Sequence, residues 1–122
     1  SEQLESTINN LKKLDFPDVK ESNVLLRDDS RSKSERRKFV SENHEIIMLI
    51  GDNLADFNDD FENKLLEERT NYSDNLRSEF GTKLIVLPNP NYGDWESNGI
   101  FGGRNLNEFE KDSVRRAKIN SY

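Results

Sequence analysis

Two aspartates four residues apart have the spacing and chemistry to hold a hard cation. Asp52 and Asp56 lie in the run IIMLIGDNLADF, residues 46–57. The apolar residues 46–50 are typical of a strand buried on both faces, and Gly51 permits a tight turn after it. Asp52 then falls just past the carboxyl end of the strand, where open α/β sheets place their ligands. If a helical turn follows, both carboxylates share one face and suit a cation such as Mg2+. The alternative, an ordinary turn in which Asp52 caps the next helix, stays equally open.

Lys33 is a candidate for binding an anion. Ser32 and Glu35 match a capping box, which predicts that Lys33 occupies the first position of a helix. A cation there opposes the helix dipole at a cost of about 0.3–1 kcal/mol. The position makes sense if an anion such as phosphate binds the free N–H groups beside the lysine. The alternative is a solvated surface lysine, one of many charges between Arg27 and Lys38.

Aromatic side chains follow another predicted strand. The sequence LPNPNYGDWE, residues 87–96, contains Tyr92 and the only tryptophan, Trp95. Exposed rings at the carboxyl end of a strand could stack on a flat ligand. A tryptophan packed down to hold the loop in place is the alternative. The only histidine, His44, precedes its strand, which favours a surface or helix-end position. The sequence has no credible Ser/His/Asp set, P-loop or zinc spacing.

Composition limits the class of protein. A chain of 122 residues suffices for one small domain that buries roughly two-thirds of its unfolded surface. Hydrophobic residues make up only 32% and charged residues 34%, and the net charge of -6 argues against a nucleic-acid partner. The absence of cysteine excludes disulfides and thiolate metal sites. The longest apolar run is five residues, so the sequence predicts no membrane span.

Predicted helices and strands alternate along the chain. Helical spacing of apolar residues predicts a helix over residues 2–14, and further helices are predicted over 32–42, 59–79 (with a break near Ser73) and 105–118. Strands are predicted at 24–26, 46–50 and 83–87, with a long loop over 88–103. This order is typical of an α/β fold with a parallel sheet.

Three segments taken together resemble one family. They are LLRDDSRSK at 25–33, LIGDNLADF at 49–57 and LPNPNYGDWE at 87–96. In this order they are similar to the class C bacterial acid phosphatases, also described as lipoprotein-type 5'-nucleotidases, of the haloacid dehalogenase superfamily. The resemblance covers nearly the whole chain. It implies that residues 1–122 form the C-terminal half of a haloacid-dehalogenase-like Rossmannoid parallel sheet flanked by helices.

The resemblance also implies Mg2+-dependent hydrolysis of phosphomonoesters, with nucleoside monophosphates as candidate substrates. In such enzymes one aspartate attacks phosphorus and forms an aspartyl-phosphate, and a second protonates the leaving group and activates water. Asp52 matches the Mg2+ ligand, and Lys33 matches the phosphate-binding lysine. Asp56 matches a second acidic position, which supports the metal shell or orients the lysine. Tyr92 and Trp95 lie in a loop that could reach the nucleoside or aromatic part of a substrate.

The sequence departs from the family at the nucleophile. The DxDxT-type motif and the strand ending in Ser or Thr are both missing: Asp28-Asp29 lacks the spacing, and Asp59-Asp60 is predicted to lie on a helix. We therefore expect this chain alone to be inactive and to need the N-terminal half of the same precursor. A homo-oligomer is a candidate assembly. The resemblance implies export to the cell surface or the extracellular space, with the signal expected upstream of Ser1.

Two strands of the superfamily's sheet would separate residues 24–26 from residues 46–50, and neither is present. The predicted strand 24–26 would then have no neighbour, so we expect the isolated chain to be unstable or rearranged. Two other functions stay open. A non-catalytic α/β module could bind partners through its sheet edge. A phospho-accepting receiver domain fits less well, because Lys33 precedes the GDN strand instead of following a later one.

Overall fold

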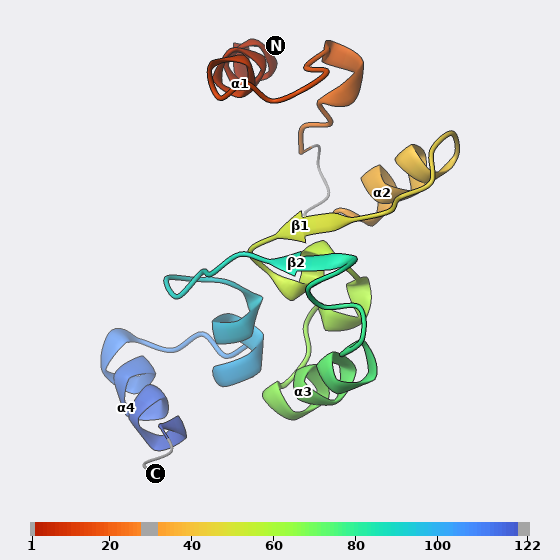
Figure 1. Ribbon diagram of the computed structural model, residues 1–122. Coiled ribbons are helices and arrows are strands. Elements are labelled where there is room, and N and C mark those ends of the chain that lie inside the picture. The colour runs from red at the N-terminus through yellow and green to blue at the C-terminus, as the bar shows by residue number, and fades with distance from the viewer. Residues whose placement is uncertain (1, 28–31, 120–122) are drawn as a thin grey trace. The chain divides into compact units, whose positions relative to one another are not determined.

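The computed structural model describes residues 2–27 and 32–119, and the chain divides into two compact units, Ser1–Arg31 and Ser32–Tyr122. The helices and strands, in chain order, are α1 (Glu2–Lys13), α2 (Ser34–Ser41), β1 (Leu49–Gly51), α3 (Leu66–Asn75), β2 (Leu84–Val86) and α4 (Glu108–Lys118) (Figure 1). Short 3-10 helices lie at Glu21–Asn23, Leu54–Asp56 and Asp59–Phe61, and a π-helix lies at Trp95–Ile100.

The described part of the first unit contains α1 and the 3-10 helix Glu21–Asn23, with irregular chain between and after them. The predicted helix over residues 2–14 is confirmed, with acidic residues in its first turn and lysines in its last, as the helix dipole favours. The predicted strand 24–26 is wrong. Val24 has extended backbone torsions, but no strand pairs with it within residues 2–27 and 32–119. An extended segment without a pairing partner cannot form a ladder. Asp28-Asp29 lies outside the described residues.

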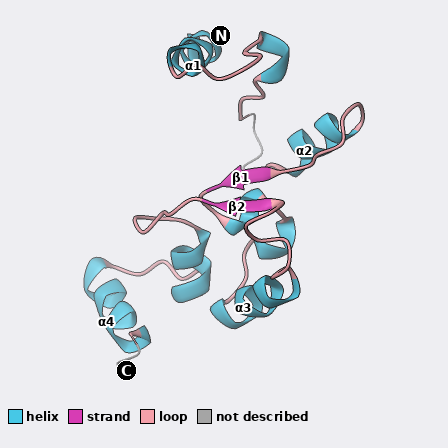
Figure 2. Ribbon diagram, in the orientation of Figure 1, coloured by secondary structure: helices cyan, strands magenta, loops and turns pink. Residues whose placement is uncertain are grey.

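The second unit contains a parallel two-stranded sheet, as predicted for an α/β fold (Figure 2). Leu49 lies opposite Leu84, and Gly51 lies opposite Val86. The chain passes from β1 to β2 through α3, the kind of crossover that parallel strands require. Both strands are shorter than predicted from residues 46–50 and 83–87, although their positions in the chain are confirmed.

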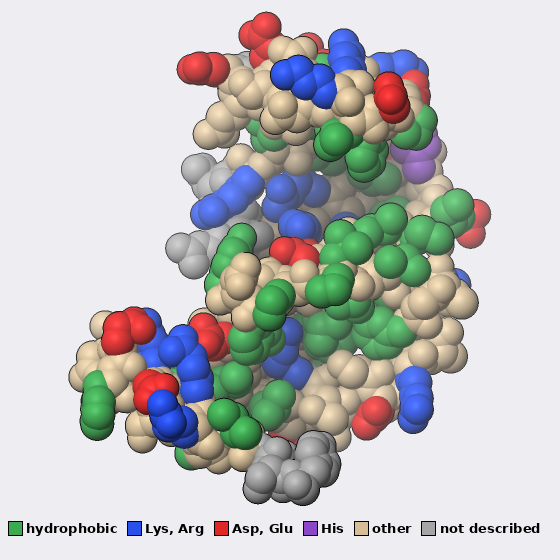
Figure 3. All heavy atoms as spheres, turned by 60° about the vertical axis from the view of Figure 1, so that its left-hand side comes forward, with side chains coloured by type: hydrophobic (Ala, Val, Ile, Leu, Met, Phe, Trp, Pro, Cys, Tyr) green, Lys and Arg blue, Asp and Glu red, His purple; other side chains and the backbone are tan. Residues whose placement is uncertain are grey.

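The prediction that residues 46–50 are buried on both faces is wrong. Ile47 is 77% exposed and Ile50 is 61% exposed. Within the described part of the chain, β1 pairs with β2 alone, so its other edge and much of its apolar surface stay uncovered. Hydrophobic side chains gather over a broad area of the surface in Figure 3. The exposed hydrophobic side chains also include Met48, Val86 and Leu87.

A small aromatic core fixes the segment after β1 against α3. The buried hydrophobic residues are Phe57, Phe61, Leu84 and Phe101. Phe61 is fully buried and meets the Tyr72 ring of α3 edge-on, with centroids 6.0 Å apart. Phe57 meets Phe80 in the same way at 6.4 Å. These contacts hold the chain that carries Asp52 and Asp56 in one conformation.

The predicted helix over 59–79 is wrong at its beginning. Asp59 and Asp60 lie in a 3-10 helix, and α3 begins only at Leu66. Asn63 has a positive φ of 55°, which no continuous α-helix accommodates. The prediction is also wrong at its end, because α3 is continuous through Ser73, ends at Asn75 and does not resume before residue 79.

Three features complete the second unit. The predicted loop 88–103 contains the π-helix, and α4 begins at Glu108 after its N-cap Asn107, later than the predicted 105. His44 lies just after α2, and its N–H donates to Val40 O at 3.0 Å, which confirms a helix-end position.

None of the helices in the described ranges is long and apolar enough to cross a bilayer.

Candidate functional site

Strand β1 ends at a tightly built turn that places both aspartates. The Asn53 side chain accepts a hydrogen bond from Ala55 N, and Asp56 Oδ2 accepts one from Asn53 N, both at 3.2 Å. A Cβ at Gly51 would lie 2.5 Å from Asp56 Oδ2, so the turn requires glycine there. The predicted helical turn is confirmed as a 3-10 helix, but its cap is Asn53 and not Asp52.

Lys33 and Asp56 meet, although they come from different elements. Lys33 Nζ lies 2.8 Å from Asp56 Oδ1. The Asp56 side chain is 14% exposed, whereas that of Lys33 is 49% exposed. Asp56 therefore has a partner on each oxygen, Lys33 and the Asn53 N–H, and it holds a lysine whose ammonium group is still open to solvent.

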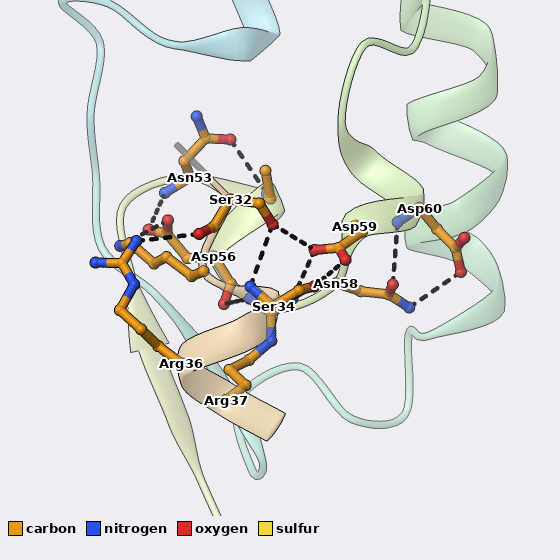
Figure 4. Close-up of polar contacts among 11 residues, drawn as sticks. Ser32, Ser34, Arg36, Arg37, Asn53, Asp56, Asn58, Asp59 and Asp60 are labelled. Carbon is orange, nitrogen blue, oxygen red and sulfur yellow. Dashed lines mark hydrogen bonds and ion pairs between the residues drawn. The ribbon is translucent and has the colours of Figure 1, made fainter. Parts of the chain in front are cut away.

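The predicted capping box at the start of α2 does not form. The helix begins at Ser34, so Lys33 is the residue before it and not its first residue. The Ser32 hydroxyl accepts from Ser34 N at 3.2 Å and donates to Asp59 Oδ1 at 3.3 Å. Ser34 Oγ also donates to Asp59, as Figure 4 shows. Asp59 therefore accepts hydrogen bonds from both serines at the start of α2.

Arg37 ties α2 to the turn after β1 (Figure 4). Its Nη1 donates to the backbone oxygen of Asp56 at 2.8 Å, and its Nη2 donates to Asp59 Oδ1 at 2.7 Å. The helix that follows Lys33 is thereby fixed against the segment that carries Asp56. Sequence reasoning missed Arg37, although its spacing of four residues from Lys33 could have indicated a shared helix face.

Asp52 has a more open environment than Asp56. Its side chain is exposed, and its Oδ2 accepts from Asn89 Nδ2 at 3.0 Å. Asn89 Oδ1 in turn accepts from the backbone N–H of Asn91 at 3.2 Å and of Tyr92 at 3.4 Å. Asp52 Oδ1 has no hydrogen-bond partner among residues 2–27 and 32–119. Asn89 is a site residue that the sequence did not single out, even though it lies in the loop 87–96.

The donor chemistry of Asp52 fits a divalent metal ion. Mg2+ prefers oxygen ligands and is commonly held by one or two carboxylates together with waters and substrate phosphates. Asp52 offers such an oxygen, whereas both oxygens of Asp56 are engaged. No group of three His, Asp or Glu able to hold a metal occurs in the described residues. The remaining ligands would therefore be water, substrate or residues beyond these.

We call residues 87–96 the aromatic loop. Tyr92 is 72% exposed. Trp95 is half-buried. A Cβ at Gly93 would lie 2.9 Å from Trp95 Cδ1 and 3.3 Å from Asn53 Nδ2, so the indole and the Asn53 side chain both lie close to Gly93. Trp95 Nε1 is buried and has no partner among the described residues. This arrangement favours the packing role for Trp95 and leaves the Tyr92 ring free to meet a ligand.

A cavity of about 590 Å³ adjoins the turn after β1. Asp52 and Trp95 line it, together with residues 86–90 and residues of α3 that include Arg69. Lys33, Asp56 and Tyr92 are not among its lining residues. The structure thus places Lys33 with Asp56 at one side of the turn, and Asp52 with Trp95 at the cavity.

Arg69 joins α3 to the aromatic loop. It is 4% exposed, and burial lowers its pKa while the charge of Asp94 opposes that shift. Its Nη1 donates to Phe61 O at 2.5 Å and to Asp94 Oδ2 at 2.8 Å. A buried cation needs such a partner. Sequence reasoning did not assign Arg69 to the site, because its partner lies 25 residues away.

Comparisons with known proteins show which family this chain is similar to. The family model of the HAD superfamily, subfamily IIIB (acid phosphatase), matches residues 1–95. The structure of the class C acid phosphatase from Bacillus anthracis matches with a TM-score of 0.86 and 35% identity, over 100% of this chain and 51% of that one. The same enzyme with tungstate bound matches with a TM-score of 0.87 and 35% identity, over 100% and 52%.

The chain spans about half the length of the structures that it matches. The family match includes Lys33, Asp52 and Asp56. The resemblance drawn from three short segments is confirmed, and so is the fold class. The chain belongs to the acid phosphatase family that forms subfamily IIIB of the HAD superfamily.

Proposed function

We propose that this chain is the C-terminal half of a Mg2+-dependent phosphomonoesterase. The observation that carries the proposal is that Lys33 pairs at 2.8 Å with Asp56 of the turn after β1, the turn that also carries the exposed carboxylate of Asp52. A cation and a metal-binding carboxylate at the carboxyl end of a parallel sheet are the groups that a phosphoryl oxygen and its metal ion require.

Each residue has a separate task in this proposal. Lys33 binds the phosphoryl oxygens through its solvent-facing ammonium group. Asp56 orients Lys33, since both of its oxygens are already bonded within the turn. The open oxygen of Asp52 would hold Mg2+, which supplies neutralising charge to the phosphoryl group when it is bound. The aspartate that forms the aspartyl-phosphate and the general acid come from outside this chain.

Tyr92 is the proposed contact for the organic part of the substrate. Its exposed ring lies on the loop that follows β2 and could stack on a nucleobase or another flat group, which supports nucleoside monophosphates as substrates. Trp95 supports the loop from beneath. The tungstate bound in the B. anthracis enzyme is a tetrahedral oxyanion like phosphate, which agrees with a phosphoryl site in this family.

We infer that an N-terminal half of the same precursor completes the enzyme. The uncovered apolar residues Ile47 and Ile50 and the match to only 51% of a relative both support this inference. The missing half would cover the sheet beside β1 and supply the nucleophile. Residues 1–122 alone would be inactive. Export to the cell surface follows from the family resemblance and belongs to the same proposal, and a homo-oligomer is a candidate assembly.

The test uses the protein encoded by the complete reading frame. Phosphate release from a nucleoside monophosphate is measured while Mg2+ is added after treatment with a chelator. We expect activity to depend on Mg2+, and Asp52→Asn to lower kcat by about 100-fold or more. Asp112→Asn, an exposed change on α4, is the matched control and should keep full activity. Full activity of Asp52→Asn would overturn the metal assignment.

A non-catalytic binding module is the second candidate, favoured by the uncovered edge of β1. The sequence encoded upstream of Ser1 separates the two functions. A DxDxT motif there supports the phosphatase. An upstream sequence without that motif supports the binding module.

A further inference from the structure

We propose that Arg69 and Asp94 are positioning residues that hold the aromatic loop so that Tyr92 favours substrates carrying a ring. The inference rests on the proposed function, because it takes Tyr92 as the residue that meets the substrate. It explains how an exposed side chain on a loop could be held in one position and so contribute to the affinity for the substrate.

Arg69 provides a fixed anchor on α3. It is 4% exposed, its Nη1 donates both to Phe61 O at 2.5 Å and to Asp94 Oδ2 at 2.8 Å, and its guanidinium carbon lies 5.9 Å from the Phe61 ring centroid. A buried guanidinium without its carboxylate partner is strongly unfavourable. Arg69 therefore restricts where Asp94 can lie.

Asp94 links Arg69 to the chain that follows the aromatic loop. Its other oxygen, Oδ1, accepts from Asn98 Nδ2 in the π-helix Trp95–Ile100. Gly99 of the same helix packs on Arg69, since a Cβ built there would lie 3.5 Å from Arg69 Cδ. The carboxyl end of the aromatic loop is thus fixed to α3 by the Asp94–Arg69 ion pair and to the π-helix by the Asp94–Asn98 hydrogen bond.

The other end of the loop is fixed to the turn after β1. Asn89 donates to Asp52 at 3.0 Å and accepts from the Tyr92 N–H at 3.4 Å. Tyr92 lies between the two anchors with its side chain 72% exposed. A ring presented on a backbone that is already fixed loses less freedom when it stacks on a ligand, and this raises affinity.

The experiment compares two substrates of the complete protein, a nucleoside monophosphate and glycerol phosphate, which has no ring. Tyr92→Ala should raise KM for the nucleotide about tenfold relative to glycerol phosphate, because stacking on an aromatic side chain is worth roughly 1–3 kcal/mol per base. Asp94→Asn should raise the nucleotide KM about threefold to tenfold and leave kcat within about twofold. Asp112→Asn removes an exposed carboxylate that bonds Arg116 at 2.8 Å, and as the control it should change neither constant.

The double variant shows whether Asp94 acts through Tyr92. If it does, adding Asp94→Asn to Tyr92→Ala produces no further rise in the nucleotide KM. An unchanged nucleotide KM in Asp94→Asn, an equal rise for both substrates, or additive effects in the double variant would each overturn the inference. Arg69→Lys, which keeps the charge, is measured in the same way if circular dichroism shows that Asp94→Asn is misfolded.

Failure of the proposed function gives a different pattern. Wild-type protein that releases no phosphate with Mg2+ would overturn the proposed function and this inference with it. A Tyr92→Ala variant with an unchanged nucleotide KM would overturn the proposed substrate contact of Tyr92 and this inference, but not the phosphatase itself. If the wild-type protein releases phosphate with Mg2+ and Tyr92→Ala raises the nucleotide KM as expected, an unchanged nucleotide KM in Asp94→Asn would overturn the positioning role alone.

Discussion

At the scale of single residues, Asp52 and Asp56 lie four positions apart in surroundings that suit different tasks. Asp56 is 14% exposed and both of its oxygens are bonded, one of them to Lys33. Asp52 is exposed, and only its Oδ2 is bonded. The sequence suggested both aspartates as metal ligands, with orientation of the lysine as the alternative for Asp56. The geometry supports that alternative.

Asp52→Asn and Asp56→Asn should therefore differ in their effect on metal binding. In the complete enzyme, Asp52→Asn should weaken Mg2+ binding about tenfold or more, as loss of a charged ligand does. Asp56→Asn should lower kcat about tenfold to 100-fold, because Lys33 loses the carboxylate that orients it, and should change Mg2+ affinity less than about threefold. Calorimetric titration of Mg2+ and steady-state kinetics measure both effects. Equal weakening of Mg2+ binding by the two substitutions would assign Asp56 to the metal.

Glu68 gives a prediction about acid sensitivity. The Leu65 N–H donates to Glu68 at 3.0 Å, and this bond lowers the pKa of Glu68 below its ordinary 4.5. A carboxylate whose folded pKa is lowered stabilises the fold above its unfolded pKa, and that stabilisation is lost as the pH falls through the folded pKa. The free energy of unfolding should thus decline below about pH 4.5.

Urea unfolding of the complete protein between pH 3 and pH 7 measures this decline. In Glu68→Gln the free energy of unfolding should fall less steeply as the pH is lowered through the acid range. Glu67→Gln is the control, because Glu67 has no capping hydrogen bond in the described part of the chain. If the free energy of unfolding of Glu68→Gln depended on pH as that of the wild type does, the hydrogen bond from Leu65 N–H to Glu68 would not be the source of the acid sensitivity.

At the scale of elements, the turn after β1 depends on a glycine. A Cβ at Gly51 would lie 2.5 Å from Asp56 Oδ2 and 2.7 Å from Asp56 Cβ. Gly51→Ala should therefore displace Asp56 from Lys33 and lower the free energy of unfolding by about 1–3 kcal/mol. Gly99→Ala is a matched control, because its nearest contact would be an ordinary 3.5 Å. Equal stabilities of the two variants in urea unfolding would show that the turn adapts to a side chain.

The sequence predicted those elements that local pattern determines. The helix over 2–14 follows from apolar spacing, and the strand after residue 46 follows from a short apolar run before Gly51. The strand at 24–26 failed because pairing depends on a neighbour that the local pattern does not reveal. The capping box at Ser32 failed because the Ser32 hydroxyl accepts from Ser34 N, two residues on, and the helix begins only at Ser34.

The candidate site was predictable to a similar degree. Motif spacing made Lys33, Asp52 and Asp56 candidates, and the structure joins Lys33 to Asp56. Arg37 and Arg69 were not found, because both act through tertiary contacts: Arg37 reaches Asp56 across 19 residues, and Arg69 reaches Asp94 across 25. Contacts across separations of this size are set by the fold. The sequence offered one sign for Arg37, its spacing of four residues from Lys33, and none for Arg69.

At the scale of the whole molecule, the central feature is a sheet whose apolar surface is left uncovered. Ile47 is 77% exposed and Ile50 is 61% exposed, and the matched class C acid phosphatase is about twice as long as this chain. Burial of such side chains contributes about 25 cal/mol per Å², so a partner that covers the free edge and faces of β1 should bind tightly. That partner should also carry the nucleophile, because no DxDxT motif occurs in residues 1–122.

The most direct test of the central claim is reconstitution from two pieces. Residues 1–122 and the polypeptide encoded upstream of Ser1 are purified separately and then mixed, and Mg2+-dependent phosphate release is measured for each piece and for the mixture. We predict that neither piece is active alone, that the mixture is active, and that Asp52→Asn in residues 1–122 abolishes the recovered activity. Phosphatase activity in the upstream piece alone, or equal activity of mixtures with and without Asp52→Asn, would contradict the account.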